Sequence, residues 1–123
     1  MQINYKIVEF VLIFIAMDIV TGLLKGWKTK SLNSTKMREG LIAKLAELAA
    51  LLFGIIVENT LPEIGIDIEV KFALLIGTYL ILMEACSIIE NIAAINDPIG
   101  KMLGGVFEKV NSQYGYKGDH NDE

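Results

Sequence analysis

The apolar residues of this chain are concentrated in three long blocks. They cover residues 7–24, 41–57 and 72–89, and one or two charged side chains interrupt each block. A helix that crosses a bilayer needs about 17–25 mostly apolar residues, so each block is long enough to cross, at the short end of that range. The second block is the weakest candidate, because Lys44 and Glu47 lie in its first two turns. The pattern predicts an all-α integral membrane protein with three transmembrane helices.

The two linkers between the blocks differ sharply in charge. Residues 25–40 contain five Lys or Arg residues and one Glu, whereas residues 58–71 contain four acidic residues and one Lys. Short loops rich in Lys and Arg remain in the cytoplasm. We therefore predict a multi-pass membrane protein whose N-terminus lies outside and whose C-terminus lies inside. The first block is interpreted as a retained span, because no small-x-small cleavage site follows it.

The pattern changes after the third block. Apolar residues between 98 and 110 recur at helical spacing, which predicts an amphipathic cytoplasmic helix. Asp97 is expected to cap this helix and Pro98 to occupy its first position. The helix is too short to span, and its mixed charge favours packing on protein over binding to a membrane surface. We predict a single membrane domain over residues 1–110 and a polar, disordered tail over residues 111–123.

Charged residues inside the apolar blocks are costly, which marks them as functional candidates. At about 1.5 Å per residue, Asp18, Glu47 and Glu84 each lie roughly 8–9 Å from the cytoplasmic end of their helix. Lys44 lies about 5 Å from that end of the second helix. All four side chains are therefore expected at one level near the cytoplasmic leaflet.

Small and polar residues form stripes on the same helices, which is typical of faces where membrane helices approach each other or contact water. The candidates for assembly or pore lining are Asp18, Gly22, Ala43, Lys44, Glu47, Ala50, Gly54, Ala73, Gly77, Glu84, Ser87 and Asn91. Two interpretations remain open. In the first, the carboxylates pair with Lys44 or Lys25, or are protonated, and hold one three-helix bundle together. In the second, they face other subunits and line a water-filled lesion, which requires many subunits because three helices cannot enclose a wide channel.

Composition and missing motifs exclude several classes of protein. With 53% hydrophobic residues, the body of the chain is not disordered, and a net charge of −4 disfavours nucleic acid as a partner. A single cysteine, Cys86, excludes an internal disulfide framework and a cysteine-built zinc site. The sequence contains no phosphate-binding loop, no His-Glu-x-x-His and no nucleophile elbow, and its one histidine, His120, lies in the polar tail. We expect no catalytic residue, no cofactor, no metal site and therefore no enzyme.

Several short motifs follow one another in a recognisable order. Asp-x-x-Thr-Gly begins at Asp18, a basic segment covers residues 32–44, Ser-x-x-Glu-Asn covers residues 87–91, and Pro98 comes after them. In this order and spacing, residues 8–110 resemble the phage holin family that includes the toxin-secretion holins of clostridia. The positions that match the family's motifs are Asp18, Thr21, Gly22, Ser34, Gly40, Ser87, Glu90, Asn91 and Pro98.

The resemblance implies a small multi-pass protein that accumulates in the lipid bilayer of a bacterial cytoplasmic membrane, forms a homo-oligomer of many subunits and opens lesions at a set time. An endolysin would then reach the cell wall and cause host cell lysis, or a large protein toxin would be secreted. The resemblance implies no catalytic role for any motif residue. Two alternatives remain open, an antiholin-like regulator of holin assembly and a small-solute membrane channel. An antiholin would not kill when expressed alone, and a small channel would not pass a folded protein.

Overall fold

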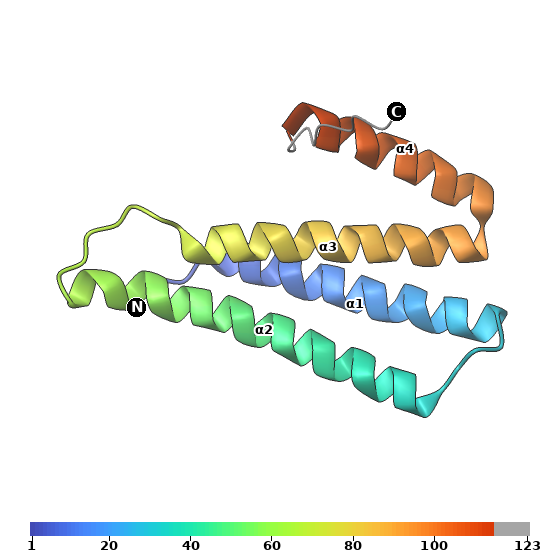
Figure 1. The fold of residues 1–123 in the computed structure, drawn as a ribbon, viewed down its shortest axis with the longest axis horizontal. Helices are drawn as coiled ribbons and strands as arrows, with labels where there is room; N and C mark the ends of the chain where they lie inside the picture. The colour runs from blue at the N-terminus through green and yellow to red at the C-terminus, as the bar shows by residue number, and fades with distance from the viewer. Residues whose placement is uncertain (115–123) are drawn as a thin grey trace, which may run out of the picture.

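All the regular structure of the described part of the chain is helical. The computed structural model describes residues 1–114. Figure 1 shows its four helices, which are α1 (Tyr5–Lys28), α2 (Ser34–Glu63), α3 (Phe72–Ile95) and α4 (Asp97–Tyr114). The first three are each long and apolar enough to cross a membrane. The three predicted spans are therefore confirmed at the level of length and composition, the second block included.

Capping side chains let α1 and α2 begin before their apolar blocks. At the start of α1, the Asn4 side chain accepts a hydrogen bond of 3.2 Å from the backbone N–H of Ile7. At the start of α2, Asn33 Oδ1 accepts hydrogen bonds from the backbone N–H groups of Thr35 at 2.8 Å and Lys36 at 3.4 Å. These bonds satisfy amide groups that the first turn of a helix leaves unpaired. The polar residues before each block therefore belong to the helices.

The start of α4 corrects the predicted cap by one residue. Asn96, not Asp97, provides the capping oxygen, since Asn96 Oδ1 accepts a hydrogen bond of 3.3 Å from the backbone N–H of Ile99. Asn96 also ends α3, so one residue joins the two helices. At its other end α4 continues to Tyr114, which makes the first four residues of the predicted tail helical. The rest of that tail, with His120, lies outside the described residues.

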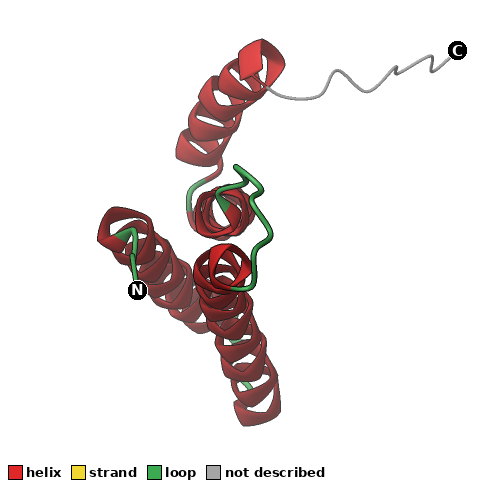
Figure 2. Cartoon of the chain, turned by 90° about the vertical axis from the view of Figure 1, so that its left-hand side faces the viewer, coloured by secondary structure: helices red, strands yellow, loops and turns green. Residues whose placement is uncertain are grey.

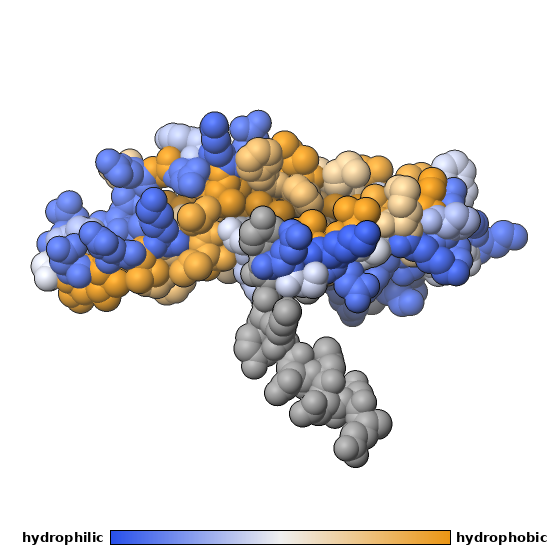
Figure 3. All heavy atoms as spheres, turned by 90° about the horizontal axis from the view of Figure 1, so that it is seen from above, coloured by the Kyte–Doolittle hydropathy of each residue, from blue (hydrophilic) through white to orange (hydrophobic). Residues whose placement is uncertain are grey.

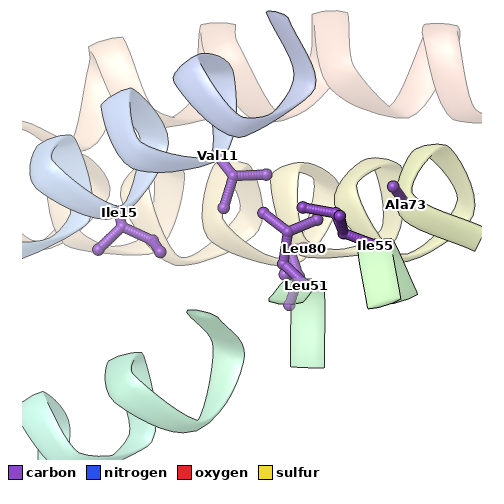
Figure 4. Packing of buried hydrophobic residues seen from close by; sticks show 6 residues of the cluster. All are labelled: Val11, Ile15, Leu51, Ile55, Ala73 and Leu80. Carbon is purple, nitrogen blue, oxygen red and sulfur yellow. The ribbon is translucent and has the colours of Figure 1, made fainter. Parts of the chain in front are cut away.

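Helix α3 is the central element of the molecule. It packs against α1 and α2 on one side and against α4 on the other, as Figure 2 shows. The apolar core lies where α1, α2 and α3 meet, and Figure 4 shows side chains of all three helices converging there. This core consists of Val11, Ile15, Leu51, Ile55, Ala73 and Leu80. The predicted amphipathic helix thus packs on its own chain, against the central helix.

Small residues set how closely the helices approach α3. Gly77 of α3 faces Ile7 of α1, and a Cβ atom added to Gly77 would overlap the Ile7 side chain. Gly100 of α4 lies against the backbone of Ala93 of α3, where an added Cβ atom would overlap the main chain. A side chain can rotate away from such an overlap, but a helix backbone cannot. The contact between α3 and α4 therefore depends on a glycine at position 100.

Most of the apolar surface of the spanning helices lies on the outside. Only 22%, 17% and 22% of the apolar windows of α1, α2 and α3 are buried within the chain. Figure 3 shows orange, apolar surface over much of the length of the molecule, with blue, hydrophilic residues at both ends and along the front edge of this view. Soluble monomers rarely expose apolar surface of this extent. Lipid tails, or other copies of the chain, are the environment in which this exterior is stable.

Candidate functional site

Lys44 of α2 joins the three spanning helices through its ammonium group. Its Nζ atom lies 2.6 Å from Asp18 Oδ2 of α1 and 2.6 Å from Glu84 Oε1 of α3. Glu84 Oε2 is also 2.6 Å away, so both oxygens of that carboxylate accept hydrogen bonds from Lys44. Glu47, one turn further along α2, contributes a third carboxylate at 3.7 Å. The common level that the depth estimate predicted for these four side chains matches these distances.

The four charged groups are largely removed from the surface. The Glu84 side chain is 1% exposed, and those of Glu47, Asp18 and Lys44 are 13%, 14% and 16% exposed. Glu47 Oε2 is buried and has no hydrogen-bond partner among the described residues. Three carboxylates surround one ammonium group, so the charges of the site do not balance within the chain. Buried ion pairs stabilise a protein only when their remaining polar atoms are also satisfied, and here one is not.

Asn91 of α3 adds a second polar contact beside the ion pairs. Its Nδ2 donates hydrogen bonds to Asp18 Oδ1 at 3.0 Å and to Thr21 Oγ1 at 3.1 Å, both on α1. The Thr21 hydroxyl in turn donates to the backbone carbonyl of Met17 at 2.8 Å. Asp18 therefore links the ion pairs on one side to the amide of Asn91 on the other.

These contacts define one continuous group of polar residues inside the helical bundle. We call it the polar cluster, and its members are Asp18, Thr21, Lys44, Glu47, Glu84 and Asn91. All three spanning helices contribute to it.

The small residues predicted beside the charges divide into two groups. Gly54, Ala73 and Gly77 are buried between helices, as residues that permit close helix contact. Ala43 and Ala50, which share a face of α2 with Glu47, are exposed.

Two further candidates lie beside the polar cluster. Ser87 is half-buried on α3. Gly22 lies next to Asn91, whose Nδ2 would be 3.6 Å from a Cβ atom on that glycine. The charged candidates make the contacts within one chain that the first interpretation describes, and their role in assembly stays a prediction.

Only some of the positions that match the family's motifs are in contact with each other. The Asp-x-x-Thr-Gly and Ser-x-x-Glu-Asn motifs come together through Asp18, Thr21 and Asn91, across about seventy residues of sequence. The other motif positions lie apart from this contact or are exposed: Ser34 at the first turn of α2, Gly40, Glu90 and Pro98.

Sequence reasoning treated the two motifs separately and missed their contact. A signal for it was present, because Asn91 lies seven residues after Glu84 and so falls on the same face of α3. That spacing does not predict which helix and which residues Asn91 contacts, namely Asp18 and Thr21 of α1.

Comparison with known proteins gives a consistent result. The sequence profile of the bacteriophage holin family matches residues 4–112. Two uncharacterised proteins of Clostridium perfringens are 32% and 33% identical to this chain, over 86% and 83% of its length and 76% and 74% of theirs. A probable holin of Bacillus phage phi105 is 26% identical over 96% of this chain and 84% of its own length. No solved structure matches the chain.

Proposed function

This chain belongs to the bacteriophage holin family, and we propose that it assembles in the bacterial cytoplasmic membrane and opens lesions there. The cargo that passes is an endolysin, which causes host cell lysis, or a large protein toxin. The protein is not an enzyme in this proposal, since its role is to open the membrane and not to catalyse a reaction. The linker at residues 29–33, within the basic 25–40 stretch, lies inside the cell, and the linker at residues 64–71, within the acidic 58–71 stretch, lies outside.

The observation that supports this proposal is the incompletely satisfied polar cluster in the middle of apolar helices. Glu47 Oε2 has no partner among the described residues, and the flanking alanines Ala43 and Ala50 are exposed on the same face of α2. Small exposed residues let a second helix approach closely within a membrane. A neighbouring copy that packs along this face brings its own polar groups near Glu47. The cluster then contributes both to the stability of one chain and to its assembly.

Two substitutions test the role of the cluster in lysis. Glu47→Leu removes the carboxylate with the unpaired oxygen, and Glu84→Leu removes the most buried charge. We expect both to delay or abolish lysis while the protein still inserts into the membrane. Glu9→Leu is the matched control, because Glu9 is an exposed carboxylate of α1 outside the cluster. Normal lysis timing in both cluster variants would contradict the proposal for these residues.

The activity itself is tested by expressing the chain in a bacterium that also makes an endolysin without its own signal. Culture turbidity and membrane potential are recorded together. Abrupt loss of potential followed by lysis that requires the endolysin is the expected result. Loss of potential without lysis would identify a small-solute channel instead. If neither the membrane potential nor the culture turbidity falls, the proposed lesion-forming activity is wrong. That result would favour a regulator that acts on another holin.

A further inference from the structure

A crevice of about 490 Å³ opens between α1 and α2 at the end of the molecule that carries the 29–33 linker. Asp18, Lys44 and Asn91 of the polar cluster contribute to its lining. Toward the linker it is lined by Lys25 of α1 and by Lys36 of α2. The crevice therefore leads from the level of the linker to the ion pairs inside the bundle.

The charge of the crevice is positive. Three lysines line it, Lys25, Lys36 and Lys44, against one carboxylate among the lining residues, that of Asp18. Lys44 is engaged with the carboxylates of the cluster. Within residues 1–114, no ion pair joins Lys25 or Lys36 to a carboxylate, and Lys25 is half-buried. Two ammonium groups are thus available for an anion.

The walls of the crevice are apolar where they face outward. Leu23, Met37 and Leu41 are 40%, 45% and 52% exposed, and Leu32 of the linker is 54% exposed. An inorganic anion gains no favourable contact with these apolar side chains, whereas an acyl chain packs against them. A molecule with an anionic head and an apolar tail matches both parts of the lining.

We propose that the crevice binds an anionic phospholipid of the inner leaflet, with its phosphate between Lys25 and Lys36. The acyl chains lie along Leu23, Met37 and Leu41. This inference rests on the proposed function only in that the 29–33 linker must face the cytoplasm. Basic pockets between membrane helices on the cytoplasmic side are suited to anionic headgroups, at about 1 kcal/mol for each Lys near the surface.

The test measures lipid binding by the purified full-length chain. The protein is placed in nanodiscs of phosphatidylcholine with increasing phosphatidylglycerol, and bound lipid is counted by native mass spectrometry after release. We expect phosphatidylglycerol to be retained in preference to phosphatidylcholine. The double substitution Lys25→Gln/Lys36→Gln should weaken this preference about thirtyfold. Lys30→Gln/Arg38→Gln is the matched control, because it removes two charges from the same basic stretch outside the crevice.

A second variant tests the space rather than the charge. Gly40 lines the crevice, and nothing lies within 4 Å of a Cβ atom placed on it, so Gly40→Trp adds a large side chain to the crevice wall at a position with room for its first atom. We expect it to lower phosphatidylglycerol retention with the charges intact and with an unchanged helical circular dichroism spectrum.

Three outcomes would overturn the proposal. Equal loss in both double variants would show general attraction to a basic linker. Displacement of the lipid by inorganic phosphate alone would show a free-anion site, and retention unchanged in Gly40→Trp would place the lipid elsewhere. None of these bears on lysis, which is measured separately.

Discussion

At the scale of the residue, Lys44 connects the three spanning helices. Its ammonium group is shared by carboxylates from all three spanning helices, at 2.6 Å from Asp18 and Glu84. Glu84 is 1% exposed, so water does not replace Lys44 if the lysine is lost. A buried charge without its partner is far more costly than a buried pair is favourable. The loss of stability on changing Lys44 is therefore dominated by the cost of leaving the buried Glu84 carboxylate unpaired.

We expect Lys44→Met to destabilise the folded chain by about 3–5 kcal/mol, because it leaves buried carboxylates unpaired. Glu84→Gln should cost less, since the amide oxygen still accepts a hydrogen bond from Lys44. Thermal unfolding of the purified protein in detergent measures both. Lys101→Met is the control, because Lys101 pairs with Asp97 at 3.2 Å on the exposed face of α4 and such pairs contribute about 0–1 kcal/mol. A similar loss for Lys44 and Lys101 would contradict the central position of Lys44.

At the scale of the element, α4 makes a close backbone contact with α3. Gly100 lies against Ala93, and one residue, Asn96, joins α3 to α4. The outward face of α4 carries exposed apolar side chains at Ile99, Met102, Val106 and Val110. The position of α4 therefore depends on the absence of a side chain at position 100.

Gly100→Leu should move α4 away from α3, because the new side chain overlaps the backbone of Ala93. Spin labels on Cys86 of α3 and on Met102→Cys of α4, both exposed positions, report the separation. We expect the distance between the labels to lengthen and to broaden. Gly105→Leu is the matched control, since a Cβ atom at Gly105 meets nothing within 4 Å and the gain in helix propensity is the same. An unchanged distance in Gly100→Leu would show that α4 adapts without separating.

The whole molecule is a thin bundle whose apolar side chains face mainly outward. Its two ends differ in charge, with five basic residues in the 25–40 stretch and four acidic residues in the 58–71 stretch. The positive-inside rule predicts an orientation from this difference, because Lys and Arg near the ends of spans remain in the cytoplasm. The predicted orientation would place the crevice beside the inner leaflet.

Single cysteines test this orientation in a Cys86→Ala background. A membrane-impermeant maleimide added to intact cells before lysis begins should label Glu63→Cys and leave Lys30→Cys unlabelled. Both positions are exposed, so access within the protein does not differ. Lys30→Cys should become reactive once the cells are permeabilised. Labelling in the reverse order would place the basic linker outside and would remove the basis for the crevice as an inner-leaflet site.

The three spans and the level of the charges were predictable because both follow from distances along single helices. Apolar block length predicts a span, and rise per residue predicts the depths of Asp18 and Glu84. The contact of Asn91 with Thr21 and the crevice beside Lys25 were not predictable. They depend on how helices rotate and tilt against each other, and small residues such as Gly77 and Gly100 set this through contacts with partners distant in the sequence.

The ion pairs of Lys44 also bear on how the chain enters the membrane during synthesis. The ribosome synthesises α1 first, then α2, then α3, so the charged residues enter the membrane in the order Asp18, Lys44, Glu84. A lone charge at the centre of a helix costs about 2.5–3.5 kcal/mol on insertion. Lys44 enters when Asp18 is already present, and Glu84 enters when Lys44 is already present. Of the carboxylates that Lys44 contacts, the least exposed, Glu84, is thus made last, and Asp18 is the one that enters the lipid before its partner exists.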